Sequence, residues 1–386
     1  MVNYLTHELI IHLIIFQFAE LAVILSNLVI LHRARKHAPP QDLPMVSILV
    51  PARNEEQNIE RCIQSLLAQD YPSFEILVLD DQSHDGTLAI LREMAEAQPE
   101  LIVLTGSTPP HNQSGKNWAC SQLARQAQGD LLFFTDADTY HQPQSLSEMV
   151  AALMGEQADL LTGFPRQQVI RWAEKLLVPF FTWASISFIP LWLAYRVRLP
   201  ALAIAVGQVM LFRREAYQKI GGHAALGAAI VDDLLLTRKI KTAGLRWRVV
   251  RLSDLISCRM YPTGQDAVQG FTKNLFAAFD FRLFIFLFVF LWLAILFLTP
   301  VVVLGSLAFG QAPNARFAEL AVCIGLSLLL WVIPYLEMGI PAYLAFLYPV
   351  TILVNETIAF RSLFFSLTGR LTWKERQLTK PSWKWW

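Results

Sequence analysis

The chain has 386 residues, of which 54% are hydrophobic and 16% charged, and its mean hydropathy is +0.40. This composition is too apolar for an ordinary soluble enzyme, so part of the chain is expected to lie in a membrane. A formal net charge of +1 argues against a surface that recruits nucleic acid. The four cysteines have neither C-x-x-C spacing nor paired histidines, which argues against a zinc site or a disulfide framework and fits a reduced, cytoplasmic domain.

The first apolar stretch runs from about Leu9 to Leu31 and is long enough to span a membrane. A basic cluster, His32 to His37, follows it directly, while no Lys or Arg precedes it. The positive-inside rule therefore places the following chain in the cytoplasm. We predict that residues 1–38 form a transmembrane anchor with a basic flank, and that a Pro-rich linker from Pro39 to Pro44 opens the next domain.

Residues 39–261 alternate short apolar runs with helical patterns. Four of these runs are typical of buried strands: Val46–Val50, Ile76–Leu79, Ile102–Leu104 and Leu131–Phe134. The alternation predicts an α/β domain with a mostly parallel sheet and helices on its faces. A further apolar stretch, 176–195, is interrupted by two prolines and is either a pair of core helices or a helix in the plane of the membrane.

After Phe279 the chain turns apolar again, with candidate spans near 283–308, 317–336 and 341–366. Three crossings after a cytoplasmic domain would leave the tail outside, whereas the basic residues of the tail favour the inside. We therefore expect one segment to be interfacial or re-entrant. The first candidate is the last segment, because Asn355, Glu356 and Arg361 interrupt it. Residues 262–386 are thus predicted to hold an interface segment, membrane helices and a basic tail.

Polar turns follow the first two predicted strands. The first strand leads into Pro51-Ala52-Arg53-Asn54-Glu55, and the second ends in Asp80-Asp81-Gln82-Ser83. Asp and Ser after a strand are common as plain turns and helix caps. Two such turns at one edge of an open α/β sheet instead favour a ligand site, because ligands bind outside the carboxyl ends of the strands.

The fourth run, Leu131–Phe134, ends in Thr135-Asp136-Ala137-Asp138. Carboxylates at i and i+2 just past a buried strand can both reach one divalent cation. Mg²⁺ and Mn²⁺ prefer such oxygen ligands and keep sites for phosphates. A lone D-x-D occurs often by chance, but its place in this series of strands predicts a metal site at Asp136 and Asp138.

With these motifs, residues 45–261 resemble the family 2 glycosyltransferases of the GT-A fold. Pro51, Asn54 and Glu55 match the family's P-x-x-N-E turn, and Gly115-Lys116-Asn117 matches its G-K segment. The resemblance assigns Pro51, Arg53, Asn54 and Glu55 to donor binding, and Arg53 stands where many members have an aromatic residue that stacks on the donor base. The resemblance implies a GT-A domain, a Rossmann-like mixed sheet that binds a nucleotide-diphosphate sugar.

The same resemblance assigns roles to the acidic turns. Asp81 would hydrogen-bond the donor base, with uracil N3–H as the expected partner. Asp136 and Asp138 would hold the Mg²⁺ or Mn²⁺ that bridges the donor diphosphate. Lys116 would meet the base or the phosphates of the donor.

A second acidic pair, Asp232-Asp233, lies farther along the chain. The family's E-D-x-x-L pattern, set in register on Gly244, assigns its catalytic aspartate to Asp233, with Asp232 in place of the usual Glu. Such a carboxylate can accept the proton of an acceptor hydroxyl, and the charge of Asp232 would raise its pKa. The pair would also fit the N-cap of a helix over 234–243. Gly207, Gln208 and Asp232 are assigned to donor binding.

Two segments resemble a membrane branch of the family associated with carotenoid and hopanoid biosynthesis. They are Arg259-Met260-Tyr261 and Gly270-Phe271-Thr272-Lys273-Asn274, and the tail segment Trp373-Lys374-Glu375-Arg376 resembles that branch's W-K-G-R. Arg259 and Lys273 are expected to neutralise the departing diphosphate. Anchoring to lipid headgroups is the alternative for Lys273.

The sequence thus predicts an integral membrane protein of a bacterial cell membrane with a cytoplasmic catalytic domain. It would move a sugar from a nucleotide-diphosphate donor, expected to be a UDP-sugar, to a carotenoid, a hopanoid or another membrane lipid. One direct displacement would invert the sugar's configuration, with the metal and basic groups stabilising the leaving diphosphate.

Three rival functions are weaker. A processive polysaccharide synthase needs more helices and a Q-x-x-R-W after Asp233, whereas the matching string of Gln168, Arg171 and Trp172 precedes it. A nucleotidyltransferase needs a Gly-rich basic loop after the first strand, which the sequence lacks. A non-catalytic membrane scaffold is opposed by the presence of all four aspartates of the motifs: Asp81, Asp136, Asp138 and Asp233.

Overall fold

The computed structural model describes residues 2–35, 37–38, 43–309, 316–373, 376–378 and 381–386. Lys374 and Glu375 of the predicted tail motif lie outside these residues, as do 39–42 of the predicted linker. The chain divides into two compact units. A helical unit comprises Met1–Leu28, Val169–Pro190 and Tyr261–Trp386, and a sheet unit comprises Val29–Gln168 and Leu191–Met260.

The sheet unit holds an eight-stranded sheet in the order β3-β2-β1-β4-β7-β6-β8-β5. Four parallel strands make its first half: β1 (Val46–Ala52), β2 (Phe74–Asp80), β3 (Leu101–Thr105) and β4 (Leu131–Phe134). All four strands predicted from apolar runs are present. Their continuous apolar sequence is explained by burial, since β1, β2 and β4 lie inside the sheet and are covered on both faces.

The second half of the sheet is mixed. β7 (Met210–Arg213) runs antiparallel to β4 and to β6 (Leu160–Gln167). β8 (Trp247–Cys258) pairs in parallel with β6 and antiparallel with β5 (Thr139–His141). The expectation of a mostly parallel sheet therefore holds for the first half, and the whole is the mixed sheet of a GT-A domain.

Helices flank this sheet within the same unit. They are α2 (Ile59–Leu67), α3 (Thr87–Ala97), α4 (Gly115–Gln126), α5 (Ser145–Gly155), α7 (Leu191–Ala194), η1 (Pro200–Leu202), α8 (Arg214–Lys219), η2 (His223–Leu226) and α9 (Asp232–Thr242). The helix predicted over 234–243 starts earlier, with Val231 at its N-cap. Asp232 and Asp233 therefore lie in the first turn, where the helix dipole favours negative charge, and the N-cap interpretation of this pair is wrong.

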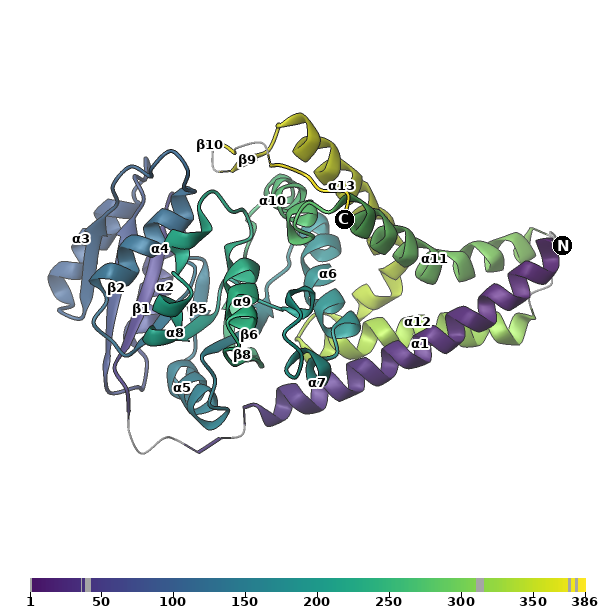
Figure 1. The fold of residues 1–386 in the computed structure, drawn as a ribbon, viewed down its shortest axis with the longest axis horizontal. Coiled ribbons are helices and arrows are strands. Elements are labelled where there is room, and N and C mark those ends of the chain that lie inside the picture. Colours follow the sequence, from purple (N-terminus) through teal and green to yellow (C-terminus); the bar gives the residue numbers. More distant parts are fainter. Residues whose placement is uncertain (1, 36, 39–42, 310–315, 374–375, 379–380) are drawn as a thin grey trace. The chain divides into compact units, whose positions relative to one another are not determined.

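Four segments of the described chain are long and apolar enough to cross a membrane: His7–Arg33, Leu283–Ala308, Phe317–Glu337 and Ala342–Thr368. They belong to the helical unit, except for residues 29–33 at the end of the first segment. These correspond to α1 (Val2–Arg33), α11 (Leu283–Ala308), α12 (Phe317–Glu337) and the pair η3 (Ala342–Leu347) and α13 (Tyr348–Thr368) (Figure 1). The remaining helices are α6 (Trp172–Phe188) and α10 (Gly264–Ala278), and β9 (Thr372–Trp373) pairs antiparallel with β10 (Arg376–Gln377).

The apolar stretch 176–195 falls on α6 and α7. Pro179 lies inside α6 without ending it, whereas α6 stops before Pro190. Trp183 of α6 stacks on Trp331 of α12 with 3.9 Å between ring centroids, and its Nε1 donates to Leu330 O at 3.0 Å. α6 is thus packed among the apolar helices of its unit.

Two polar residues that interrupt the apolar sequence of α1 face other helices. Gln17 Nε2 donates to Ser327 Oγ of α12 at 2.8 Å. Asn27 Nδ2 donates to the carbonyl oxygens of Ile186 and Ile189, each at 2.8 Å. Hydrogen bonds of this kind hold apolar helices together where the hydrophobic effect between them is weak.

Candidate functional site

The polar turns after β1 and β2 are bonded to each other. Asn54 N donates to Ser83 Oγ at 2.9 Å, and His84 N donates to Asn54 Oδ1 at 2.9 Å. Glu55 N donates to Thr87 Oγ1 at 2.8 Å. Asn54 has a φ of 52°, a left-handed conformation that Asn tolerates better than most residues. These bonds fix the P-x-x-N-E turn against the acidic turn of the neighbouring strand.

Arg53 and Asp81 are buried at the same edge of the sheet. Arg53 Nη1 donates to Asp81 O at 2.5 Å and to Gln82 O at 3.2 Å, while Asp81 N donates to Ala52 O at 2.7 Å. Pro51 lies inside β1, opposite Leu79. The guanidinium of Arg53 therefore joins the two turns through backbone oxygens.

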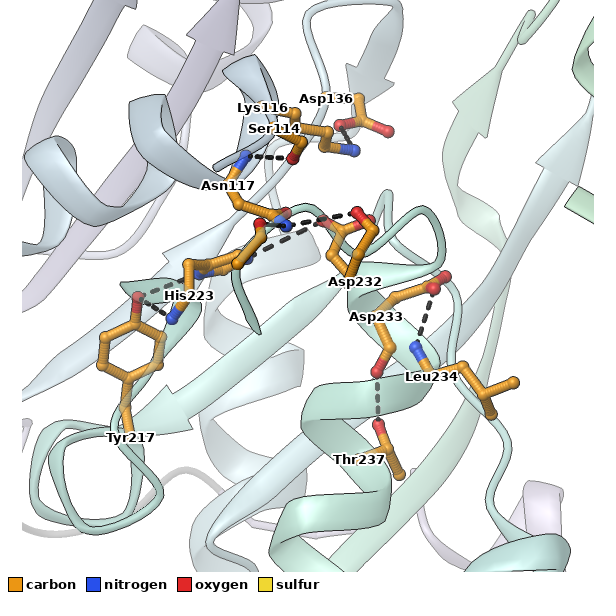
Figure 2. A network of polar contacts seen from close by, with 12 residues as sticks. Ser114, Lys116, Asn117, Asp136, Tyr217, His223, Asp232, Asp233, Leu234 and Thr237 are labelled. Carbon is orange, nitrogen blue, oxygen red and sulfur yellow. Dashed lines mark hydrogen bonds and ion pairs between the residues drawn. The ribbon is translucent and has the colours of Figure 1, made fainter. Parts of the chain in front are cut away.

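Asp136 and Asp138 follow β4, as the sequence places them. Lys116 Nζ, at the start of α4, donates to Asp136 Oδ1 at 2.7 Å (Figure 2). Asp138 Oδ1 accepts from Cys258 Sγ at 3.4 Å. Burial, together with the charges of Asp136 and Glu55, raises the pKa of Asp138 to about 7.

This charge distribution fits a divalent cation. Burial, and then the charges of Asp136 and Glu55, oppose ionisation of Asp138, and a dication would offset this with the oxygen ligands that Mg²⁺ and Mn²⁺ prefer. Within the described part of the chain, no group of three His, Cys, Asp or Glu side chains is arranged to hold a metal. A cation at Asp136 and Asp138 would therefore take its other ligands from water or from the donor diphosphate.

Gly207 and Gln208 lie between β4 and the start of α9. Thr135 Oγ1 donates to Gln208 O at 2.9 Å, which holds this segment against the end of β4. A Cβ added at Gly207 would lie 3.4 Å from Asp233 Oδ2. The structure thus brings the segment 207–208 and Asp233 together.

Asp233 lies in the first turn of α9. Its Oδ1 accepts from Leu234 N at 2.7 Å, and its carbonyl oxygen accepts from Thr237 Oγ1 at 3.0 Å (Figure 2). Burial, and then the charge of Asp232, raises the pKa of Asp233 to about 6. A carboxyl group with this pKa is ionised at neutral pH and is more basic than an ordinary aspartate.

A buried polar network around Asp232 was missed from the sequence. His223 Nε2 lies 3.8 Å from Asp232 Oδ2, and His223 Nδ1 lies 2.8 Å from the Tyr217 hydroxyl (Figure 2). His223 N donates to the same hydroxyl at 3.0 Å. The tautomer that satisfies all three contacts accepts the hydroxyl proton at Nδ1 and directs Nε2–H at Asp232. Burial lowers the pKa of His223 to about 4, so this ring is neutral.

The start of α4 holds the loop that leads to Asp232. Asn117 Nδ2 donates to Gly227 O at 3.0 Å and to Ala229 O at 3.2 Å, and the Ser114 hydroxyl caps α4 by accepting from Asn117 N (Figure 2). Burial opposes the charge of Lys116, yet the charges of Asp136 and Asp232 raise its pKa above the ordinary value. Lys116 therefore stays charged between the two acidic motifs.

The two predicted basic residues fall in different units. Arg259 N donates to Asp138 O at 3.4 Å, so Arg259 lies beside the D-x-D turn. Lys273 lies in α10 and belongs to the helical unit rather than to the unit that carries the acidic motifs. Tyr217, His223 and Ser114 are the polar members of the site that the motifs did not indicate.

The model of glycosyl transferase family 2 matches residues 47–221, which include both donor-site turns and the D-x-D. This segment is therefore similar to that family over a little less than half of the chain. A 4,4'-diaponeurosporenoate glycosyltransferase of Staphylococcus haemolyticus is 25% identical to the chain over 236 residues, which are 60% of each protein. A beta-monoglucosyldiacylglycerol synthase of Trichormus variabilis is 29% identical over 230 residues, 58% of this chain and 45% of that protein. The chain spans about half the length of these relatives.

The fold of the chain resembles that of a solved structure. The mannosyltransferase PcManGT of Pyrobaculum calidifontis, in complex with GDP-Man and Mn²⁺, superposes with a TM-score of 0.51 at 20% identity. The match covers 92% of this chain and 99% of that one, so it includes the apolar helices as well as the sheet. The likeness shows the fold, a GT-A domain with terminal apolar helices.

Proposed function

We propose that the chain is a metal-dependent glycosyltransferase that moves a sugar from a nucleotide-diphosphate donor to a lipid-like acceptor at the cytoplasmic face of a membrane. The observation that carries this proposal is the meeting of two acidic motifs in a family 2 domain. Lys116 donates a hydrogen bond to Asp136 of the first motif, and the charges of Asp136 and Asp232 both raise the pKa of Lys116. One site therefore offers carboxylate ligands for a cation, a positive charge for a diphosphate and a carboxylate that can accept a proton.

The donor is proposed to bind at the carboxyl edge of β1, β2 and β4. Asp81 lies at this edge in a turn held by Arg53, where a carboxylate can accept from N3–H of uracil, and a UDP-sugar is the proposed donor. Lys116 and Arg259 would neutralise the diphosphate, since both lie beside the D-x-D turn. Asp136 and Asp138 would hold Mg²⁺ or Mn²⁺, which when bound neutralises charge on the diphosphate.

The chemical step is a single displacement. The acceptor oxygen forms a bond to the anomeric carbon while the bond from that carbon to the diphosphate oxygen breaks, which inverts the configuration. The hydroxyl proton passes to Asp233, and the electron pair leaves with the diphosphate. Asp233 suits this role because its pKa of about 6 leaves it ionised at neutral pH and able to take a proton.

The acceptor is proposed to come from the membrane. Apolar helices long enough to span a bilayer lie on both sides of the family 2 domain in the chain. The name of the Trichormus variabilis relative indicates a glycosylated diacylglycerol, which is a lipid. Both features favour a hydrophobic hydroxyl or acid over a soluble sugar as the acceptor.

The test is sugar transfer by the purified full chain in lipid nanodiscs. UDP-sugars would be offered with membrane lipid extracts, and the products separated by chromatography. We expect a singly glycosylated lipid, loss of transfer on chelation, recovery with Mn²⁺ or Mg²⁺, and no transfer by Asp138→Ala. Asp70→Ala, an exposed aspartate away from the motifs, is the matched control and should keep full activity. Transfer in excess chelator would refute the metal requirement, and polymeric products would favour a processive synthase.

A further inference from the structure

Residues 381–386 fold back onto the start of α11. Leu283 N donates to Lys384 O at 2.8 Å, Phe284 N donates to Trp385 O at 3.1 Å, and Lys384 N donates to Phe281 O at 2.8 Å. The first two bonds occupy backbone N–H groups of the first turn of α11, which have no partner within the helix itself. Lys384 Nζ also pairs with Asp280 Oδ2 at 2.8 Å. The end of the described chain is therefore fixed beside the beginning of α11.

This contact limits how often the chain crosses a membrane between Leu283 and Lys384. The membrane face at which α11 begins is called the near face. α11 leads away from it, and residues 309–316 are too few to span a bilayer, so α12 begins at the opposite face and returns. Because Lys384 lies beside Leu283, the chain after α12 has to begin and end at the near face. A complete crossing by α13 would put Lys384 on the wrong side.

The contacts of α13 agree with an incomplete crossing by this helix. The ring of Tyr348, its first residue, lies 6.0 Å from Phe297, halfway along α11, and 6.2 Å from Trp331 of α12. Farther along α13, Ser362 Oγ accepts from Phe276 N near the end of α10 at 3.0 Å. Phe276 in turn packs on Phe286, one turn into α11. α13 thus starts among the spanning helices and ends near the beginning of α11.

The folded-back segment exposes aromatic rings next to the apolar surface of α11. Trp385 and Trp386 are 57% and 74% exposed, and Phe284, which contacts both rings, is 41% exposed. Exposed rings of this size are costly in water, whereas Trp beside Lys is the composition typical of the bilayer interface. Continuity with α11 identifies the partner as the headgroup layer of the membrane.

We infer that residues 381–386 and the first turn of α11 form an interfacial anchor in the lipid headgroup layer, and that α13 is re-entrant. The chain then crosses the bilayer three times, with α1, α11 and α12. The chain passes from the sheet unit to α11 through α10, which is not among the segments able to span, so no crossing separates the anchor from the last residue of the sheet unit along the chain. This inference does not depend on which reaction the sheet unit catalyses.

The side of the anchor is tested by thiol labelling. The four native cysteines are buried, so single cysteines introduced at exposed positions report their own side. Ser382→Cys reports the anchor, Glu93→Cys in α3 reports the sheet unit, and Phe309→Cys reports the far end of α11. With a membrane-impermeant maleimide we expect Ser382→Cys and Glu93→Cys to label from one side and Phe309→Cys from the other. Labelling of Ser382→Cys together with Phe309→Cys would overturn the inference.

The depth of the anchor is tested by fluorescence in nanodiscs. The emission lost in the double variant Trp385→Phe and Trp386→Phe is the signal of the two rings. Bromine atoms placed on the lipid chains close to the headgroup should quench this signal more than bromines at the chain ends, and aqueous iodide should quench it weakly. Trp192→Phe, in α7 of the sheet unit, removes a ring that is 47% exposed and gives the reference for an iodide-accessible tryptophan. Strong quenching by iodide, or strongest quenching at the chain ends, would refute an interfacial position.

Discussion

Asp232 and Asp233 are neighbours in the sequence but meet different groups in the fold. Asp232 faces the buried ring of His223, and its charge raises the pKa of Lys116. Asp233 lies next to Gly207 and accepts only the N–H of Leu234 among the side-chain bonds described. A backbone N–H at one oxygen leaves the other oxygen of Asp233 able to accept a proton. The pair therefore divides into a charge-setting residue and a candidate base.

Replacing the candidate base tests this division. Asp233→Asn keeps the size of the side chain and one acceptor oxygen but removes proton acceptance, so turnover should fall by about a hundredfold to ten-thousandfold. Nucleotide affinity should stay unchanged, because the donor motifs are at other turns. Asp232→Asn should have a milder effect. Turnover numbers and nucleotide dissociation constants of both variants decide the matter, and a collapse confined to Asp232→Asn would move the base by one residue.

The pH dependence of kcat/KM should reflect the same pair. A general base works only when ionised, so the rate should fall as the pH drops below about 6, the pKa of Asp233, and should level off above it. The charge of Asp232 contributes to raising this pKa, so Asp232→Asn should move the acidic limb to lower pH. A limb that stays in place in the Asp232→Asn profile would show that another group is titrating.

The Tyr217 hydroxyl should matter although it is remote from the chemical step. Tyr217→Phe removes the donor to His223 Nδ1, and His223 is then free to adopt the other tautomer, which offers no proton to Asp232. Loss of one hydrogen bond is worth about 1 kcal/mol, so we expect about a fivefold loss of turnover. The acidic limb should shift as well, which a purely structural effect would not produce. Phe212→Leu, which alters the packing on Tyr217 but no hydrogen bond, is the control and should leave the limb in place.

Among the helices and strands, those with one dominant sequence signal were predicted best. β1, β2 and β4 are apolar throughout because they are buried on both faces, and their polar ends mark the site. β8 was not predicted, because half-buried polar residues and one exposed residue, Asp254, interrupt its buried ones. The partnership of Tyr217 with His223 was also not predictable from spacing. Gly221 and Gly222 indicate a turn before His223, but only the folded backbone shows that this turn brings His223 against the Tyr217 hydroxyl.

Gly222 should be indispensable to that turn. Its φ is 52°, and a Cβ would come within 2.4 Å of the Tyr217 ring. Gly222→Ala therefore combines backbone strain with a clash and should lower the free energy of unfolding by at least about 1–3 kcal/mol. Gly207→Ala is the matched comparison, because its Cβ would meet Asp233 at an ordinary 3.4 Å. Thermal unfolding in detergent should show a lowered midpoint for the first variant only. Equal midpoints would mean that the turn has an alternative conformation.

In the molecule as a whole, the charged motifs and the apolar segments occupy different parts of the sequence. The candidate spans contain few charged residues, and polar side chains inside them bind other helices, as Gln17 binds Ser327. The acidic motifs lie in the sheet unit between these spans. Under the proposed function, a catalytic unit joined to the bilayer at both ends of its sequence would sample only the thin layer of solution next to the membrane. It would therefore meet lipids at their surface density rather than at their bulk concentration.

This geometry predicts surface-dilution kinetics for a membrane acceptor. In mixed micelles, transfer should follow the mole fraction of acceptor lipid in the micelle. Adding inert detergent at constant total acceptor should therefore slow the reaction in proportion. The apparent KM for the nucleotide sugar should not change, because the donor arrives from water. The control is the same dilution series with the donor alone, scored by nucleotide binding, which detergent should leave unaltered. A rate that followed bulk acceptor concentration, or a preference for a soluble oligosaccharide, would show that the acceptor reaches Asp233 from solution.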